Sequence, residues 1–207
     1  ELNIWNTSSA TGNHTLHAVG LARAIRKYGD DGIVFSSQGE SSASEGYVFE
    51  AVNGADREKL PVVFVIQNNG YGISVPIHEA TANELVSDNF RGFRNLKIIN
   101  CDGTNAFDSM AAMEQAVATI RKTGGPVMVH ARCVRYFAHS NSDRQELYRE
   151  TEEMAGDYAE ELAAEMLATT LNVDFDPERS WDEKKEIYRI SNKRVKTKNL
   201  TQSAIGD

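Results

Sequence analysis

The sequence predicts an α/β fold with an open, mostly parallel sheet and flanking helices. Short apolar runs that suit strands alternate with longer segments of helical period, which is typical of strand–helix–strand crossovers. Polar segments follow three of these apolar runs, at the end of an open sheet where ligands bind. The chain has 207 residues, 41% of them hydrophobic, which is enough for one domain with a sizeable core and too apolar for a disordered chain.

The first expected helix covers about residues 14–28, where apolar residues recur at steps of three and four and Gly29 follows as a cap. A strand is expected over residues 32–37. A second helix covers about 45–59. The unbroken apolar run 62–66 then predicts a strand buried on both faces.

Two more strands are expected over residues 96–100 and 126–130, with a helix between them. The core face of that helix is predicted from apolar spacing as Phe107, Met110, Met113, Val117 and Ile120. Residues 1–150 are therefore expected to form the α/β domain.

Residues 151–207 are predicted to form a charged helical extension. Eight acidic residues and one basic residue lie between positions 146 and 165, whereas seven basic and three acidic residues lie between 182 and 198. Solvated helices, or an arm that packs on a neighbour, account for such charge runs without any catalytic role.

Charge and cysteine content exclude several classes of protein. With 22 basic and 30 acidic residues, the net charge of −8 argues against nucleic acid as a partner. No apolar run approaches the roughly 18 residues of a membrane span, and no signal peptide opens the chain. Cys101 and Cys133 fit a reducing compartment, so a soluble intracellular protein is expected. The chain begins at Glu1 rather than Met, which suggests a piece of a longer protein.

Polar side chains at the ends of two expected strands suit a metal–phosphate site. Glu40 follows one strand and Asn69 follows another, and carboxylate and amide oxygens are ligands that Mg²⁺ accepts. Gly39 permits close approach of a ligand, and the start of the helix over 45–59 suits a phosphate. Spacing alone leaves two other interpretations open, an ordinary Asn-Gly turn and a serine-rich helix cap.

The histidines differ in their expected roles. His130 lies in a strand and is predicted to be a hydrogen-bonded core residue. His14 packs or meets solvent, with a contact to a cofactor pocket as an alternative. His139 lies in a polar loop beside Arg135 and Asp143, where a functional role is as plausible as a surface position.

Residues 39–46 and 59–76 together resemble the thiamine diphosphate motif, which reads Gly-Asp/Glu-Gly, about thirty residues, then Asn-Asn. The stretch is similar to the α subunit, or the α part of a fused chain, of the decarboxylating component of 2-oxo acid dehydrogenases. The branched-chain (2-oxoisovalerate) type is most similar. Residues 8–20 and the His-Ser-x-Ser-Asp core in 134–143 also resemble this family, over about residues 4–149 in all.

This resemblance implies a thiamine-diphosphate-binding fold and a set of site residues. Magnesium would be bound by Glu40, the side chain of Asn69 and the carbonyl of Tyr71. His139 would be catalytic. The implied cofactor-binding residues are Ser9, Thr11, Gly39, Ser41, Ser42, Ile73, Arg135 and His139. An ordinary core position remains an alternative for Ile73, and Ser140 matches a serine that is phosphorylated in mitochondrial members.

The resemblance also implies an activity and partners. The expected reaction is oxidative decarboxylation of a 2-oxo acid with reductive acylation of a lipoyl group on the complex's transacylase. A β subunit or fused β segment would complete the active site, giving a heterotetramer or a dimer of fused chains that is inactive without the β part. The expected location is the cytoplasm, or the mitochondrial matrix in a eukaryote, and neither nucleic acid nor a membrane is an expected partner.

Three departures from the family pattern motivate a non-catalytic alternative, and a second alternative concerns the substrate. Ser41 replaces the second glycine of the motif, Gln67 stands where an arginine often meets the phosphates, and Ala138 replaces a frequent histidine. The alternatives are a pyruvate or acetoin dehydrogenase α subunit and a non-catalytic member whose cofactor site has decayed. A Rossmann-type nucleotide protein has little support, because Gly-x-Gly-x-x-Gly is missing after the first strand.

Overall fold

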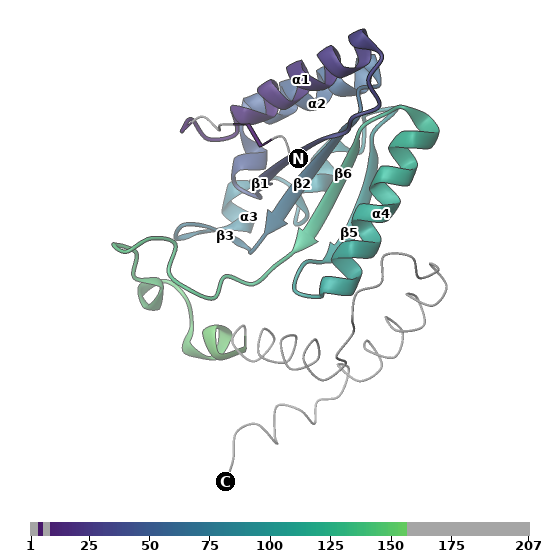
Figure 1. The fold of residues 1–207 in the computed structure, drawn as a ribbon. Coiled ribbons are helices and arrows are strands. Elements are labelled where there is room, and N and C mark those ends of the chain that lie inside the picture. The colour runs from purple at the N-terminus through teal and green to yellow at the C-terminus, as the bar shows by residue number, and fades with distance from the viewer. Residues whose placement is uncertain (1–3, 6–8, 157–207) are drawn as a thin grey trace.

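The computed structural model describes residues 4–5 and 9–156, which form a single parallel sheet covered by helices on both faces (Figure 1). Four strands lie in the order β1-β2-β6-β5, and each pairs with its neighbour in parallel. Their bounds are Val34–Gly39 for β1, Val62–Asn68 for β2, Val127–Arg132 for β6 and Lys97–Asp102 for β5. The predicted α/β class with a parallel sheet is therefore confirmed.

Three long helices cover the two faces of the sheet (Figure 1). Helices α1, His14–Tyr28, and α2, Gly46–Glu58, lie side by side on one face, and α4, Ala106–Thr123, lies on the other. Gly29 ends α1 with φ +74°, a left-handed cap that glycine adopts without strain. Helices α1 and α2 begin and end within one residue of the predicted positions, and α4 contains the whole predicted apolar stripe from Phe107 to Ile120.

The two cores differ in how their helices meet the sheet. Residues 62–66 of β2 are buried on both faces, as predicted from their unbroken apolar run. Within helix α4 itself, the buried residues are Ala112, Ala116 and Ile120. The predicted stripe on α4 is thus only partly right, because small alanines let this helix approach the sheet and leave larger neighbours such as Met110 half-buried.

Strand β1 forms one edge of the sheet within the described part of the chain. Its side chains alternate, so that Val34, Ser36 and Gln38 are buried on the α1–α2 side while Phe35 on the opposite side is 52% exposed. The strand begins two residues later than predicted and continues to Gly39, which places Glu40 directly after the last paired residue.

The strand register gathers three polar segments at one end of the sheet. Gly39 of β1 pairs with Gln67 of β2, and Asn68 of β2 pairs with Arg132 of β6. The segments 36–44, 67–76 and 135–143 therefore leave the sheet at its carboxyl edge from three neighbouring strands. Ligands bind at this edge in open α/β sheets.

Short elements complete the described chain. They are η1 Ser42–Ser44, the hairpin strands β3 Tyr71–Gly72 and β4 Val75–Pro76, α3 Ile77–Ala80, η2 Val86–Phe90 and η3 Gln145–Leu147. Residues 151–156 are helical, and the rest of the predicted charged extension lies outside the described residues. Among the helices that the structure describes, none is both long and apolar enough to cross a membrane.

Candidate functional site

Glu40 is a buried carboxylate at the carboxyl end of β1. Its side chain belongs to a residue that is only 1% exposed, and its Oε2 accepts the N–H of Asn69 at 3.2 Å. Burial raises the pKa of the Glu40 carboxyl, and hydrogen bonds from backbone N–H groups and the positive charge of Arg135 only partly oppose this. None of the ion pairs among the described residues includes Glu40. The site therefore holds a carboxylate that would gain from a cation.

The loop after β2 brings the predicted metal ligands together. Besides the contact to Glu40, the Asn69 Oδ1 accepts the N–H of Tyr71 at 3.1 Å. Gly70 between them has φ +81°, which lets the chain turn back without strain. The Asn-Gly sequence thus forms a turn, as one interpretation holds, and this turn also presents Asn69 to the buried carboxylate.

The serine-rich segment after Glu40 is not an ordinary helix cap. Neither Ser41, at the start of η1, nor Glu45, at the start of α2, makes a side-chain hydrogen bond to the helix it precedes. Ser41 Oγ and Ser44 Oγ are instead buried without a hydrogen-bond partner. Ser41 also packs so tightly against Gly72 that a Cβ there would lie 2.2 Å from its Oγ, so the β3–β4 hairpin requires glycine at this position.

The segment before α1 lies against this serine-rich segment. Gly12 has φ +76°, and a Cβ added there would lie 3.3 Å from the carbonyl oxygen of Ser42. Ser9 and Thr11, both predicted to bind the cofactor, are exposed beside it. His14 Nε2 lies 2.9 Å from the carbonyl oxygen of Ser37, at the carboxyl end of β1. The structure thus brings together two of the segments that resemble the family, residues 8–20 and residues 39–46.

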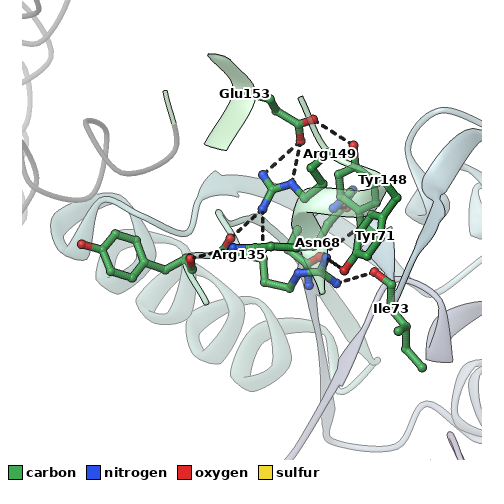
Figure 2. Close-up of polar contacts among 11 residues, drawn as sticks. Asn68, Tyr71, Ile73, Arg135, Tyr148, Arg149 and Glu153 are labelled. Carbon is green, nitrogen blue, oxygen red and sulfur yellow. Dashed lines mark hydrogen bonds and ion pairs between the residues drawn. The ribbon is translucent and has the colours of Figure 1, made fainter. Parts of the chain in front are cut away.

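Arg135 links the loop after β6 to the hairpin (Figure 2). Its Nη1 donates to the carbonyl oxygen of Ile73 at 2.6 Å, and its Nη2 donates to the hydroxyl of Tyr148 at 2.5 Å. Ile73 itself has φ +58°, a strained conformation for a β-branched residue, and its side chain is 51% exposed. The alternative that Ile73 is an ordinary core residue is therefore wrong.

Asp143 organises the loop that carries His139. Its Oδ2 accepts the main-chain N–H of His139 at 2.8 Å and the hydroxyl of Tyr148 at 2.7 Å. The hydrogen bond from His139 is the main reason why the pKa of Asp143 is lowered. His139 is exposed, and the structure does not bring its ring into contact with Glu40. The backbone of the loop is thus held by Asp143, while the predicted catalytic side chain is exposed.

Arg149 forms a second tie between this loop and the hairpin, as Figure 2 shows. It is 5% exposed, donates to Glu153 Oε1 through Nε and Nη2, and donates to the carbonyl oxygen of Arg135 at 2.8 Å. Glu153 Oε2 in turn accepts the hydroxyl of Tyr71 at 3.0 Å. Six residues connected by these hydrogen bonds hold the loop and the hairpin together, and we call them the clasp: Tyr71, Arg135, Asp143, Tyr148, Arg149 and Glu153.

Some site residues escape sequence reasoning. Gln38 is 4% exposed, and neither its Oε1 nor its Nε2 has a hydrogen-bond partner. Ser36, Gln38 and Glu40 occur at every second position, so an alternating strand directs all three to one face, which is an unusual pattern for a buried face. That alternation is the signal that would have identified Gln38. For His14 the sequence left a contact with the cofactor pocket open, but no local pattern predicts its contact with Ser37, which depends on how α1 packs.

The donor set around Glu40 limits which ion fits. Within the described residues, no three His, Cys, Asp or Glu side chains gather as a metal cluster. One carboxylate, one amide oxygen and one carbonyl remain, which suits Mg²⁺ because this ion keeps several waters and phosphate oxygens among its ligands.

Comparison with known families decides the family of the chain. The family model described as "Dehydrogenase E1 component" matches residues 1–193. The chain belongs to the dehydrogenase E1 component family. This E1 chain is 34% identical over 143 residues to the 3-methyl-2-oxobutanoate dehydrogenase α subunit of Mycobacterium tuberculosis, a match that covers 69% of this chain and 39% of that protein. It is 36% identical over 135 residues to the pyruvate dehydrogenase E1 α subunit of Zymomonas mobilis, covering 65% of this chain and 38% of the relative.

The E1 chain spans about two fifths of the length of these curated relatives. It also resembles a protein of a different kind, a probable pyruvoyl-dependent arginine decarboxylase of Chloroherpeton thalassium. That match is 60% identical over 60 residues, or 29% of this chain and 33% of the relative. Among solved structures, a transketolase from Campylobacter jejuni has a TM-score of 0.52 at 23% identity, covering 58% of this chain and 20% of the transketolase. This likeness supports the fold.

Proposed function

We propose that this chain is the α part of a 2-oxo acid dehydrogenase E1 component that uses thiamine diphosphate and Mg²⁺. The supporting observation is the hydrogen bond between Glu40 and Asn69. The two residues lie 29 positions apart in sequence, and a buried carboxylate with a raised pKa accepts the N–H of the asparagine. The spacing and the contact both fit the thiamine diphosphate motif that the sequence resembles.

The residues present fit a magnesium ion. Glu40, the Asn69 side chain and the Tyr71 carbonyl would hold it, and the positive charge would remove the cost of keeping a carboxylate buried. Asn69 Oδ1 has a second lone pair besides the one that accepts the Tyr71 N–H, so the turn does not prevent it from binding a cation.

The same segment fits a diphosphate. The hydroxyls of Ser41 and Ser44, which have no hydrogen-bond partner among the described residues, and the start of α2 would bind its oxygens. Ser41 would add a side-chain donor at the position where the family has a glycine. Thiamine diphosphate, when bound, supplies a positive ring that accepts the electrons released on decarboxylation. Ile73, held by Arg135 with its side chain exposed, would support the cofactor through apolar contact.

His139 and the β partner would complete the active site. We propose that the ring of His139 moves protons and stabilises charge at the reacting carbon once the β part and cofactor are in place. Ser9 and Thr11 would contact the cofactor from the segment before α1. The product would be an acyl group passed to a lipoyl group on the transacylase of the complex.

The cofactor proposal is tested by calorimetric titration of thiamine diphosphate into the full-length protein with its β part, with and without Mg²⁺. We expect binding that requires Mg²⁺ and is lost in Glu40→Ala. Glu50→Gln, which changes an exposed carboxylate on α2, should bind as the unsubstituted protein does. Absence of binding in the complete assembly would favour the non-catalytic alternative, which Ser41 and Gln67 motivate.

We further propose a branched-chain 2-oxo acid as the substrate, since the motif segments are most similar to that type. The match to a pyruvate dehydrogenase α subunit keeps pyruvate as the second candidate within the class. The ratio of kcat/KM for 2-oxoisovalerate and pyruvate in the complete enzyme decides between them. One methylene in a pocket discriminates by about 1–3 kcal/mol, so a preference of tenfold or more is expected.

The 60-residue match favours a second candidate function, arginine decarboxylation dependent on a pyruvoyl group. Release of CO₂ from carboxyl-labelled arginine by the full-length protein would support it. Release only from 2-oxo acids would leave the matched segment without that activity.

A further inference from the structure

We infer that His130, held by Ser87, is a positioning residue that fixes the Asn69–Tyr71 loop for magnesium. The inference rests on the proposed function, because it concerns the loop expected to bind the ion. His130 lies on β6 and is 2% exposed, and Ser87 lies on η2 and is fully buried. The predicted role of His130 as a hydrogen-bonded core residue is confirmed, and its partners extend that role toward the site.

Asn68, the residue before the expected ligand, connects His130 to the loop. Its Nδ2 lies 2.9 Å from His130 Nε2, and its Oδ1 accepts the N–H of Gly70 at 2.9 Å. Its carbonyl oxygen also accepts the N–H of Cys133 at 2.7 Å. The side chain of Asn68 thus bridges β6 and the turn, and its orientation fixes where the chain leaves β2.

The chemistry of these groups determines the direction of each hydrogen bond. An amide NH₂ only donates, so His130 Nε2 must accept from Asn68. The neutral ring then carries its proton on Nδ1 and donates to Ser87 Oγ, which lies 2.7 Å away. The ring is kept neutral because burial lowers the pKa of His130. Each member of the chain Ser87–His130–Asn68–Gly70 therefore orients the next.

Without His130, the side-chain NH₂ of the buried Asn68 would lose its hydrogen-bond acceptor. An unpaired amide NH₂ there would rotate to find a partner and release Gly70, and the expected ligands Asn69 and Tyr71 flank that glycine. Partners that orient a metal site from behind its ligands typically change metal affinity by about 10–100-fold when removed. We expect about tenfold here, since His130 acts through Asn68.

The test is a Mg²⁺ titration of the full-length protein with its β part at saturating thiamine diphosphate, with melting temperature measured in parallel. His130→Leu should raise the Kd for Mg²⁺ about tenfold, and His130→Gln, whose amide oxygen can accept from Asn68, should restore most of the affinity. Met128→Leu is the matched control, because Met128 lies two residues earlier on the same strand and is fully buried. It should lower stability without changing the Kd.

The outcomes separate the inference from the proposed function. An unchanged Kd in His130→Leu, or equal losses in His130→Leu and Met128→Leu, would overturn the positioning role. If His130→Leu does not fold, His130→Gln and Ser87→Ala are compared by their Kd for Mg²⁺. The ¹⁵N shifts of the His130 ring must also report a proton on Nδ1 in the unsubstituted protein, and they should change in Ser87→Ala, which removes the acceptor of that proton. Magnesium-independent behaviour of the unsubstituted protein would instead refute the proposed function, and the inference with it.

Discussion

Glu40 shows how one side chain can lower stability and provide function. A buried carboxylate without a contacting cation destabilises the fold whenever it is ionised, because water no longer solvates it. Glu40 is buried, its Oε2 accepts the N–H of Asn69 at a long 3.2 Å, and the backbone hydrogen bonds around it only partly offset the loss of water. Such an arrangement is expected of a group whose partner is a ligand.

Glu40→Gln is expected to raise the free energy of unfolding at pH 7 in the absence of Mg²⁺. The pKa of Glu40 is raised in the folded state, so the stability difference between variant and original is largest at neutral pH and disappears below the unfolded pKa of about 4.3. Urea denaturation at pH 7 and at pH 4 measures this. If the variant is less stable than the original at pH 7, other groups of the folded protein already stabilise the ionised Glu40 carboxylate.

Ile73 stores backbone strain in the hairpin. Its left-handed conformation costs a β-branched residue about 1–3 kcal/mol, and glycine would remove that cost at the expense of extra freedom in the unfolded chain. Ile73→Gly should therefore raise stability by about 1 kcal/mol and weaken binding of thiamine diphosphate. Thermal unfolding and titration together test this, with Ile73→Ala as the variant that keeps the strain. If Ile73→Gly lowers the stability, the left-handed backbone at Ile73 does not cost the free energy inferred here.

At the scale of elements, the sequence predicted the sheet well and its long-range contacts poorly. Apolar runs and helical periods located every long element, since these patterns follow local geometry. The link between Asn68, His130 and Ser87 joins residues 62 and 43 positions apart, and no local pattern encodes it. Glu40 and Asn69 follow two predicted strands and belong to one motif, so the sequence predicts them together, whereas Gln38 belongs to no motif and only its alternation with Ser36 indicates a buried position.

The clasp should control the loop rather than the fold. Tyr148→Phe removes the hydroxyl that donates to Asp143 and accepts from Arg135, which should cost about 1 kcal/mol. We expect faster hydrogen exchange over residues 135–149, with the melting temperature shifted by no more than a few degrees. Tyr28→Phe, at a residue 80% exposed on the far end of α1, is the control. Equal exchange in the two variants would show that the clasp hydroxyl does not restrain the loop.

At the scale of the whole molecule, the site depends on three strands that are neighbours only after folding. The order β1-β2-β6 brings the segments that follow these strands to one edge, and each contributes a different group: a carboxylate, an asparagine turn and an arginine loop. The α/β pattern predicted such an edge, but not which side chains would be exposed on it. His139, Ser9 and Thr11 are exposed here, so their proposed roles depend on what the rest of the assembly adds.

The position of β1 at the edge of the sheet has a consequence for handling the protein. Its outer backbone groups face no further strand within the described part of the chain, and neither lysine nor proline interrupts the sequence Val-Phe-Ser-Ser-Gln-Gly. An edge without such protection is a template on which another extended chain can add itself. Phe35, half exposed beside it, would give that addition an apolar contact. In isolation, this chain should therefore lose solubility with rising concentration, and charge introduced at Phe35 should delay the loss.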